Sequence, residues 1–344
     1  MSFTYRNRMP EVADILSEIP LPPELGAIKK QRDDELRAII SGTDDRFLLV
    51  IGPCSADAEA PVLEYGERLA RLQEQVRERV ILVPRIYTNK PRTTGDGYKG
   101  MMHQPKANEA PDVVEGLKAL RRLHVKAIAQ TGLPAADEML YPENYPYVED
   151  LLTYVAIGAR SVENQLHRLT VSGLDIPVGM KNPTSGDLGV MLNSIQAAQG
   201  QHQFIYNRWQ VETAGNPWAH AILRGAVDHH GRAVPNFHYE NIMETLALYE
   251  KRGLANPAIL IDTNHANSNK QYREQIRIAL EVMTNRRLSP AIRRVVKGLM
   301  IESYLVEGAQ SPTSIPHTRG QSVTDPCLGW EESERLVLDI AELA

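Results

Sequence analysis

The sequence predicts an α/β protein folded as a (β/α)8 TIM barrel. Short apolar runs recur along its 344 residues, separated by amphipathic stretches. The runs are too short for helices and mostly lack the alternation of half-exposed strands, which is typical of parallel strands buried on both faces. The eight expected strands are residues 47–51, 80–84, 133–136, 155–159, 176–180, 203–206, 258–261 and 298–301. Eight strand and helix pairs in about 250 residues favour a barrel, and a doubly wound open sheet is the alternative.

The stretches between the expected strands are amphipathic. The clearest expected helices are residues 59–78, 110–130, 187–199, 238–252 and 268–283, several of which end at Gly or precede Pro. In a barrel of this kind the carboxyl ends of all strands meet at one rim, where catalytic groups collect.

Two segments exceed what a barrel needs. Residues 1–45 predict an N-terminal helical arm with helices near 11–19 and 24–40, and residues 208–224 predict a strand-rich excursion after the sixth strand. The predicted division is an arm, residues 1–45, and a catalytic barrel, residues 46–344. Such segments either contact other subunits and regulators or simply close the bottom and side of the barrel.

Composition and charge exclude several classes of protein. With 42% hydrophobic and 24% charged residues, the chain can bury a large core, as soluble enzymes do. A net charge of −5 without a basic run argues against nucleic acid or a membrane as partner. The N-terminus lacks an apolar leader region, and no run approaches the ~18 apolar residues of a membrane span. Only two cysteines, Cys54 and Cys327, are present, so we expect no disulfide framework and a cytoplasmic protein.

Four residues of metal-binding type follow expected strands. Cys54 follows the first strand and His265 the seventh, while Glu302 ends the eighth and Asp325 lies in the loop beyond it. This mixture of a soft ligand with nitrogen and oxygen donors suits Mn²⁺, Fe²⁺, Co²⁺ or Zn²⁺ better than Ca²⁺ or Mg²⁺. Taken singly, each residue also has a structural interpretation, and no His-x-x-x-His or Cys-x-x-Cys spacing adds an independent signal. Together they predict a divalent metal site at the rim.

Cations also gather at the ends of expected strands. They are Arg85, Lys90, Arg92, Arg160, Lys181 and Arg224. A cation at the end of an apolar strand usually has a fixed anionic partner. Glu138 and Glu163 can satisfy part of this demand as structural ion pairs. The remaining charge suits two phosphates and a carboxylate, because Arg forms bidentate contacts with such groups and Lys supplies point charge.

The composition of the loop after the second expected strand indicates a further surface for contacting an anionic ligand. Pro91 stiffens the loop between Lys90 and Arg92, and Thr93 and Thr94 add hydroxyl groups. Lys181 has an alternative role, since a buried Lys at a strand end can form a Schiff base. Binding of phosphate or carboxylate is the interpretation we favour for Lys181.

Several strings occur in a fixed order along residues 44–330. They include Ile51-Gly-Pro-Cys-Ser55, Lys90-Pro-Arg-Thr-Thr94, Gly158-Ala-Arg160, Gln165-Leu-His-Arg168, Leu223-Arg-Gly225, His265-Ala-Asn-Ser268, Glu302-Ser303 and Thr324-Asp325. In this order they resemble the class I 3-deoxy-D-arabino-heptulosonate 7-phosphate (DAHP) synthases, typified by feedback-regulated bacterial enzymes. The resemblance implies a reaction of phosphoenolpyruvate with erythrose 4-phosphate and water that yields DAHP and phosphate, the first step of the shikimate pathway.

The resemblance also implies roles for the residues named above. The implied ligands of a divalent metal, Mn²⁺ first, are Cys54, His265, Glu302 and Asp325. The implied phosphoenolpyruvate contacts are Arg85, Lys90, Arg160, Lys181 and Arg224, and those of erythrose 4-phosphate are Lys90, Pro91, Arg92, Thr93, Thr94 and Asp325. Lys90 is the first candidate for proton transfer, with Glu138 or His265 as rivals. A homodimer or homotetramer is expected, and a chorismate mutase is a candidate partner.

Three other functions remain open at this point. A related synthase acting on arabinose 5-phosphate carries Lys-Ala-Asn-Arg-Ser-Ser where this chain has the string from Lys90 to Thr94. A Schiff-base aldolase would use Lys181. A non-catalytic barrel would bind metabolites and regulate a partner enzyme, and the fold alone does not decide, because barrels host many chemistries.

One departure from the feedback-inhibited relatives concerns regulation. The arm and the excursion are shorter than theirs, and Asp175 occupies a position that is small and neutral in their inhibitor pocket. A buried or half-buried carboxylate there would disfavour an apolar side chain nearby. We therefore expect weak or absent inhibition by phenylalanine, tyrosine or tryptophan.

Overall fold

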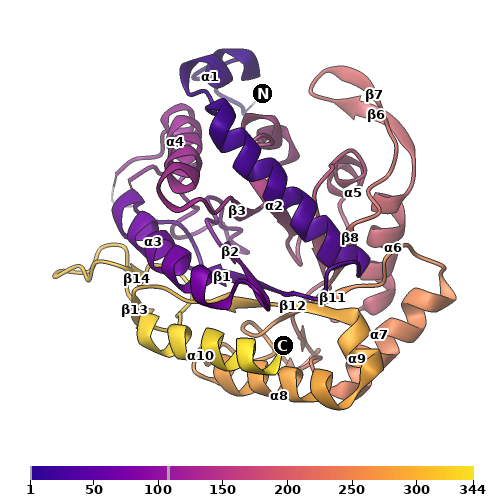
Figure 1. The fold of residues 1–344 in the computed structure, drawn as a ribbon. Coiled ribbons are helices and arrows are strands. Elements are labelled where there is room, and N and C mark those ends of the chain that lie inside the picture. The colour runs from indigo at the N-terminus through magenta and orange to yellow at the C-terminus, as the bar shows by residue number, and fades with distance from the viewer. Residues whose placement is uncertain (1, 107–108) are drawn as a thin grey trace.

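Eight parallel strands form one sheet that curls into a barrel in the computed structural model, which describes residues 2–106 and 109–344 (Figure 1). In spatial order the strands are β2 (Val80–Pro84), β1 (Phe47–Gly52), β12 (Val296–Glu302), β11 (Ile259–Asp262), β8 (Ala219–Leu223), β5 (Val178–Lys181), β4 (Leu152–Ile157) and β3 (Ala135–Glu138). Arg85, directly after β2, bridges Ala136 of β3 and so joins the two ends of the sheet. The predicted (β/α)8 barrel is confirmed.

Helices surround the barrel (Figure 1). They are α3 (Glu59–Val76), α4 (Val113–Thr131), η1 (Pro142–Tyr147), α5 (Gln165–Val171), α6 (Leu188–Gln199), α7 (Tyr239–Lys251), α8 (Glu274–Leu288), α9 (Pro290–Val295) and α10 (Trp330–Leu343). Local signals fix their ends. In α4 the Asp112 side chain accepts from the N–H of Glu115, and Gly132 ends the helix with a φ of 66°.

The apolar core has two layers, because successive side chains of a strand point to opposite faces. Phe47, Leu49 and Ile51 of β1 belong to the outer layer against the helices. Leu48 and Val50 belong to the inner cluster that fills the barrel. Neither face of the strands meets water, which explains their continuous apolar sequence.

The N-terminal arm contains two helices, α1 (Val12–Glu18) and α2 (Pro23–Ser41). Pro23 starts α2 and Gly42, with a φ of 79°, ends it. The helix lies across the barrel (Figure 1), and its Leu36, Ile39 and Ile40 belong to the cluster inside the barrel. Of the two interpretations of the arm, closure of the barrel therefore describes α2.

The predicted place of the excursion is wrong. The expected sixth strand, residues 203–206, belongs to β6 (His202–Tyr206), which pairs antiparallel with β7 (Trp209–Thr213) in a hairpin outside the barrel (Figure 1). The sixth barrel strand is β8, which lay inside the predicted excursion, so the hairpin precedes this strand. Residues of β6 alternate between exposed and half-buried, as a solvated hairpin requires, whereas every residue of β8 is buried. The polar His220, the second residue of β8, concealed it.

Two pairs of short strands lie outside the main sheet, one after β8 and one after β12. They are β9 (Ala226–Val227) with β10 (Ala233–Val234), and β13 (Val306–Ala309) with β14 (Gln321–Ser322). The second pair sits just before Asp325 and helps to fix the loop that carries it. Among the described residues, the helices include none with the length and apolar composition needed to traverse a bilayer.

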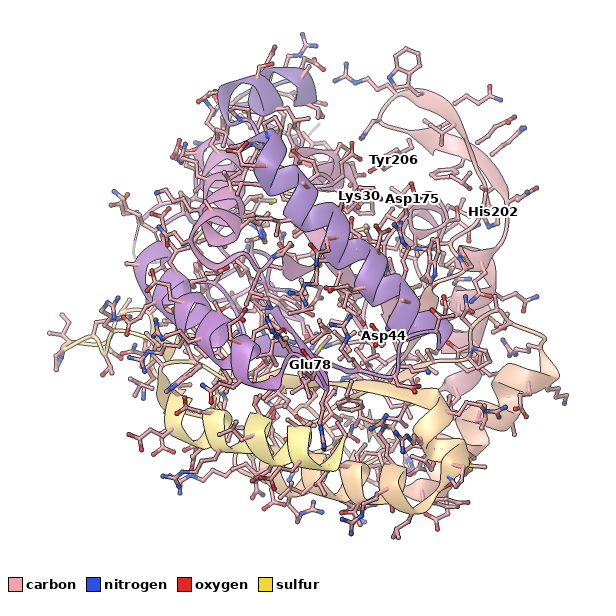
Figure 2. The ribbon with its side chains drawn as sticks, in the orientation of Figure 1. Lys30, Asp44, Glu78, Asp175, His202 and Tyr206 are labelled. Carbon is pink, nitrogen blue, oxygen red and sulfur yellow. The ribbon has the colours of Figure 1, made fainter. Side chains whose placement is uncertain are left out.

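Asp175 lies between α2 and the hairpin (Figure 2). Its backbone carbonyl accepts from Nη1 of Arg37 on α2 at 2.7 Å, and the residue is exposed. The premise of a buried carboxylate at this position is therefore wrong, because a hydrated charge does not disfavour an apolar ligand in that way. The expectation of weak inhibition no longer follows from it.

Candidate active site

A cavity of about 290 Å³ opens where the strands of the barrel end. Glu138 at the end of β3, Lys181 at the end of β5 and Arg224 after β8 reach it. Most residues predicted for the site line this cavity: Lys90, Pro91, Arg92, Thr93, Thr94, Glu138, Arg160, Lys181, Arg224, His265 and Asp325. Cys54, Arg85 and Glu302 do not line it and are fully buried beside it. The predicted residues therefore meet in one place, as a barrel rim requires.

Three cations form one wall of the cavity, called here the cation wall: Arg160, Lys181 and Arg224. They come from the neighbouring strands β4, β5 and β8. Arg160 is exposed, whereas Lys181 and Arg224 are buried. Nη1 of Arg224 is buried and has no hydrogen-bond partner among the described residues, and burial lowers the pKa of this guanidinium. A buried cation of this kind is suited to an anionic ligand.

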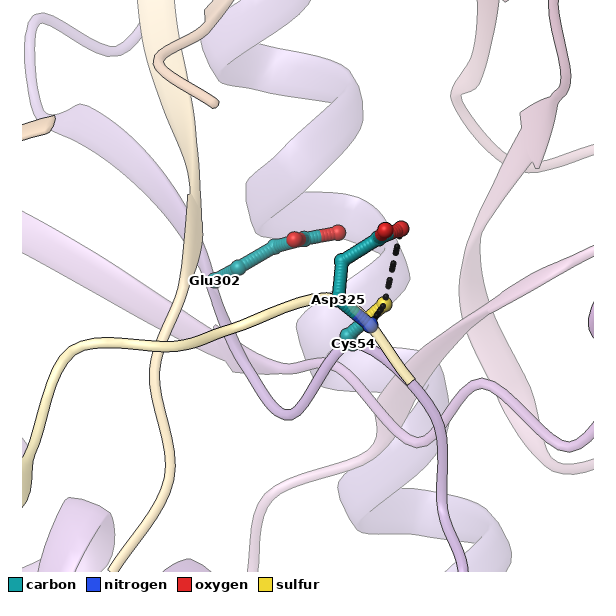
Figure 3. Close-up of side chains that lie close together, drawn as sticks. All are labelled: Cys54, Glu302 and Asp325. Carbon is teal, nitrogen blue, oxygen red and sulfur yellow. Dashed lines mark hydrogen bonds between the residues drawn. The ribbon is translucent and has the colours of Figure 1, made fainter. Parts of the chain in front are cut away.

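Three possible metal ligands form a second group, called here the donor cluster: Cys54, Glu302 and Asp325 (Figure 3). Their ligand atoms all lie within 4.8 Å of one another. Sγ of Cys54 lies 3.5 Å from Oδ2 of Asp325 and accepts from the Asp325 N–H at 3.4 Å. The group joins the end of β1, the end of β12 and the loop after β14. Three of the four predicted metal ligands are thus brought together.

Lys90 connects the donor cluster to the cavity. Its Nζ lies 2.7 Å from Sγ of Cys54 and 2.9 Å from Oδ2 of Asp325. Burial acts to raise the pKa of Asp325, but the Lys90 ammonium outweighs burial and holds this pKa well below its usual value. Burial and the nearby Glu302 carboxylate raise the pKa of the Cys54 thiol to about 11. The positive charge of Lys90 therefore compensates the negative charge of the Asp325 carboxylate.

His265 is the predicted metal ligand that lies apart from the donor cluster. Its Nδ1 is 2.8 Å from Oδ2 of Asp262, and its backbone φ is 51°, in the left-handed region. Nζ of Lys181 lies 2.9 Å from the same Asp262 oxygen. Burial alone would raise the pKa of Asp262, but His265 and Lys181 outweigh it and hold this pKa well below its usual value. The ring lines the cavity beside Lys181, with which it shares the Asp262 oxygen.

Arg85 lies deeper than predicted for a substrate contact. Its Nη2 is 3.3 Å from Oε1 of Glu302, and both residues are only 1% exposed. The guanidinium carbon lies 3.9 Å from the centre of the Tyr87 ring. Its Nη1 is buried without a hydrogen-bond partner among the residues described. Arg85 therefore orients Glu302 and keeps one donor group available.

The remaining predicted residues form the wall opposite His265. Glu138 is buried, and its Oε1 has no hydrogen-bond partner in the described parts of the chain. The loop of Pro91, Arg92, Thr93 and Thr94 is partly exposed, and Nε of Arg92 donates to the Tyr98 carbonyl at 2.9 Å. Arg92 holds the loop, and the hydroxyl-bearing Thr93 and Thr94 line the cavity.

Two buried site residues were missed by sequence reasoning, as was the exposed Lys270, which lines the cavity. Asp262 pairs with Lys181 and His265, and Asn264 donates from Nδ2 to Oε2 of Glu302 at 2.5 Å. Both belong to the string that contains His265, and Asp262 ends a buried strand. A buried carboxylate at a strand end was the signal that could have identified it.

Comparison with known proteins gives consistent matches. The model of the DAHP synthetase I family matches residues 26–338. A phospho-2-dehydro-3-deoxyheptonate aldolase of Haemophilus influenzae is 38% identical over 340 residues, covering 97% of this chain and 91% of that protein. The Tyr-sensitive phospho-2-dehydro-3-deoxyheptonate aldolase of Salmonella typhimurium is 41% identical over 310 residues, covering 88% and 83%. A solved structure of phospho-2-dehydro-3-deoxyheptonate aldolase from Francisella tularensis has a TM-score of 0.93 at 32% identity, covering 99% of this chain and 98% of that one.

The family match covers the whole barrel except its last residues, and it also includes most of α2. The relatives are matched over most of their length, so the likeness does not rest on a shared fold alone. The resemblance inferred from the ordered strings is confirmed. The chain is an enzyme of the DAHP synthetase I family, the class I DAHP synthases.

Proposed function

We propose that the chain condenses phosphoenolpyruvate with erythrose 4-phosphate and water, releases DAHP and inorganic phosphate, and requires a divalent metal ion. This reaction is the first step of the shikimate pathway. One observation carries the proposal: the cation wall lines the same cavity as Lys90 and Asp325, and these two residues contact each other and Cys54 of the donor cluster. Two anionic substrates and one metal need this combination of groups.

The donor set fits a transition-metal ion. Cys54 supplies a soft sulfur ligand, and Glu302 and Asp325 supply hard oxygens. Because burial raises the pKa of Cys54, a divalent cation beside the thiol is what would favour its thiolate. With His265 on the wall of the same cavity, these residues would hold Mn²⁺, Fe²⁺, Co²⁺ or Zn²⁺, of which we propose Mn²⁺ first. Such an ion, when bound, supplies Lewis acidity for polarising the sugar aldehyde.

The cation wall binds phosphoenolpyruvate in this proposal. Arg160 and Arg224 contact its phosphate and carboxylate, and Lys181 adds point charge that Asp262 holds in place. Arg85 contributes its free Nη1 from below. Fixing the substrate at several points orients its C3 carbon for attack on the aldehyde carbon.

The loop after β2 binds erythrose 4-phosphate. Arg92 and the hydroxyl groups of Thr93 and Thr94 contact its phosphate, and Pro91 limits the loop's conformations. Asp325, the residue of the donor cluster that lines the cavity, accepts a hydrogen bond from a sugar hydroxyl. The two phosphates are then bound by different segments, which keeps the two substrates in a fixed order along the cavity.

Lys90 and Glu138 carry the proton transfers. Burial acts to lower the pKa of Lys90, but the neighbouring Cys54 and Asp325 raise it well above its usual value, so Nζ stays protonated. A proton from Nζ passes to the aldehyde oxygen as the carbon–carbon bond forms. Glu138 takes a proton from the water that adds to C2 before the carbon–oxygen bond to phosphate breaks, and its Oε1 has no hydrogen-bond partner among the described residues. His265 is the rival for this second role.

Release of inorganic phosphate from phosphoenolpyruvate tests the proposal. We expect release with erythrose 4-phosphate, none with arabinose 5-phosphate, loss after EDTA treatment and recovery when Mn²⁺ is added. Release with arabinose 5-phosphate would favour the related synthase. Binding of phosphoenolpyruvate without turnover would favour a regulatory barrel, and trapping by borohydride with indifference to EDTA would favour a Schiff base on Lys181.

We further propose that the chain assembles as a homodimer or homotetramer. Ile205 and Trp209 of the hairpin are 76% and 74% exposed, and Phe3 and Tyr5 near the N-terminus are 80% and 91% exposed. Arg208 at the hairpin turn lies 3.8 Å from Glu11, so the two exposed segments approach each other. Light scattering of the wild type and an Ile205→Lys variant tests this, with a smaller species expected for the variant. Association with a chorismate mutase and a cytoplasmic location stay predictions.

A further inference from the structure

A buried carboxylate stands next to the reaction cavity without lining it. Asp137 is the penultimate residue of β3 and is 5% exposed. Glu138, the next residue, lines the cavity, and successive side chains of a strand point to opposite faces. Asp137 accordingly faces α4, where Nε2 of His124 lies 3.7 Å from its Oδ2.

The Asp137 carboxylate binds the chain on both sides of the seam between β2 and β3. Its Oδ1 accepts from the N–H of Thr88 at 2.9 Å and from the N–H of Glu138 at 2.7 Å. Its Oδ2 accepts from the Thr88 hydroxyl. The last backbone bond across this seam runs from the Ile86 N–H to the Ala136 carbonyl. Beyond Ile86, the Asp137 side chain replaces backbone hydrogen bonds in joining the β2 segment to β3.

This carboxylate is costly to bury, since its one ion-pair partner among the described residues is His124, at 3.7 Å. Neither ring nitrogen of His124 has a hydrogen-bond partner among the residues described, and 3.7 Å exceeds hydrogen-bond distance. A buried charge without a close ion pair normally destabilises a fold. Its three short contacts therefore point to a role in fixing Thr88 and Glu138.

Thr88 begins the loop that carries Lys90. Its carbonyl accepts from the Met102 N–H at 3.1 Å, and the N–H of Lys90 donates to the Lys99 carbonyl at 3.0 Å. Thr88 is fully buried and is therefore pinned on two sides, by Asp137 and by Met102. Lys90 lies two residues further along, within contact of the donor cluster.

We propose that Asp137 is a positioning residue that sets the Lys90 loop and the Glu138 carboxylate relative to each other. It acts through Thr88 and through the backbone of Glu138, and it touches neither substrate. The proposal rests on the proposed function, because it assigns the effect to the two residues that transfer protons and to the loop that binds erythrose 4-phosphate. Small displacements of such groups reduce the rate strongly.

Asp137→Ala and Asp137→Asn test the proposal, with Asp33→Ala and Asp33→Asn as matched controls. Asp33 on α2 is also buried, and it also accepts from a threonine hydroxyl, that of Thr153 at 2.7 Å, but it lies outside the cavity. We expect kcat/KM for erythrose 4-phosphate to fall about a hundredfold in Asp137→Ala and about tenfold in Asp137→Asn, which keeps one acceptor oxygen. The KM for phosphoenolpyruvate should change less than about threefold in both Asp137 variants.

The Asp33 variants separate positioning from stability. We expect them to lower Tm comparably while kcat/KM stays within about twofold of wild type. Equal kinetic losses in the Asp33 and Asp137 variants would overturn the proposal. If Asp137→Ala does not fold, Asp137→Asn and Thr88→Val are compared with the Asp33 variants instead. Thr88→Val removes only the hydroxyl contact.

Hydrogen exchange gives a readout that does not depend on the reaction. Amides of residues 86–94 should exchange faster in Asp137→Ala than in wild type and in Asp33→Ala, because the Thr88 N–H loses its acceptor. Unchanged exchange in this segment would overturn the proposal even if activity fell. An inactive wild type with the expected exchange pattern would instead contradict the proposed function and leave the positioning of the loop intact.

Discussion

The donor cluster and the cation wall are held in place by different means. The residues of the donor cluster come from three separate segments of the chain, and their ligand atoms lie within 4.8 Å of one another. Cys54 and Asp325 contact each other and Lys90, while Glu302 contacts Arg85. The residues of the cation wall come from neighbouring strands, β4, β5 and β8, and no ion pair or hydrogen bond joins them to each other in the described parts of the chain. Strand spacing of about 4.8 Å sets their separation.

The two groups also differ in whether their charged side chains already have partners of opposite charge. In the donor cluster, Lys90 and Arg85 offset Asp325 and Glu302. On the cation wall, Lys181 has a carboxylate partner, but no partner is observed for Nη1 of Arg224 among the described residues. A divalent metal ion would compete with Lys90 and Arg85 for the carboxylates of the donor cluster, while the cation wall gains most from an anionic ligand.

Removing the thiol of the donor cluster should have the largest effect. We expect Cys54→Ala to lose more than about a hundredfold in activity and to bind less metal, because even indirect supports of metal ligands often cost ten- to hundredfold. Metal content by mass spectrometry and phosphate release are the measurements. Cys327→Ala is the control, since Cys327 is equally buried and not part of the cluster. Equal metal content in the two variants would contradict a role for Cys54.

Asp262 holds two residues that line the cavity, so its substitution should have the next largest effect. It holds Lys181 of the cation wall and His265 on the cavity wall. We expect Asp262→Asn to lower kcat about ten- to hundredfold, because both partners lose their charged orienting group. Stopped assays at saturating substrates measure kcat. A change in KM alone would show that Asp262 supports binding and not the chemical step.

Arg224→Gln should affect one substrate only. We expect the KM for phosphoenolpyruvate to rise about thirtyfold, since a charged hydrogen bond contributes about 2 kcal/mol, with kcat and metal content nearly unchanged. Arg232→Gln is the control, because Arg232 is exposed and outside this cavity. Loss of metal in the Arg224 variant would mean that the two sides are not separate.

The smallest effect concerns stability at acid pH. Beneath the cation wall, His220 of β8 accepts from the Tyr154 hydroxyl at 2.8 Å, its Nδ1 lies 2.8 Å from the Trp218 carbonyl, and burial lowers its pKa to about 4. As the pH falls from about 6.5 towards 4, the unfolded chain binds a proton that the folded chain excludes, which costs up to about 3 kcal/mol. Above pH 6.5 the residue adds no pH dependence.

Urea unfolding at several pH values tests this with His220→Gln. The variant should lose less stability than wild type between pH 6.5 and 4, whatever its stability at neutral pH. His229→Gln, in an exposed turn, should behave as wild type. A wild type and a His220 variant with parallel pH profiles would show that another group dominates this acid sensitivity.

Sequence reasoning located most of the fold because buried parallel strands leave a strong local signal. It failed at β8, where a buried His interrupts the apolar run, and at β6, whose Phe204 and Ile205 lie on a solvated hairpin. The strand ends identified the site residues, since a barrel gathers them at one rim. Lys90 contacts Cys54, and Asp262 contacts His265. These contacts depend on the directions of the side chains, which the hydrophobic pattern of the sequence does not reveal.

The position of α2 limits how far this enzyme can be treated as modular. We propose residues 1–45 as an arm and 46–344 as the barrel, yet Leu36, Ile39 and Ile40 fill the barrel's interior. A shortened chain that begins at β1 would expose that interior to water, and an arm exchanged with a relative would have to bring matching side chains. The arm and the barrel are therefore expected to diverge in evolution as one unit, with free variation confined to residues before α2.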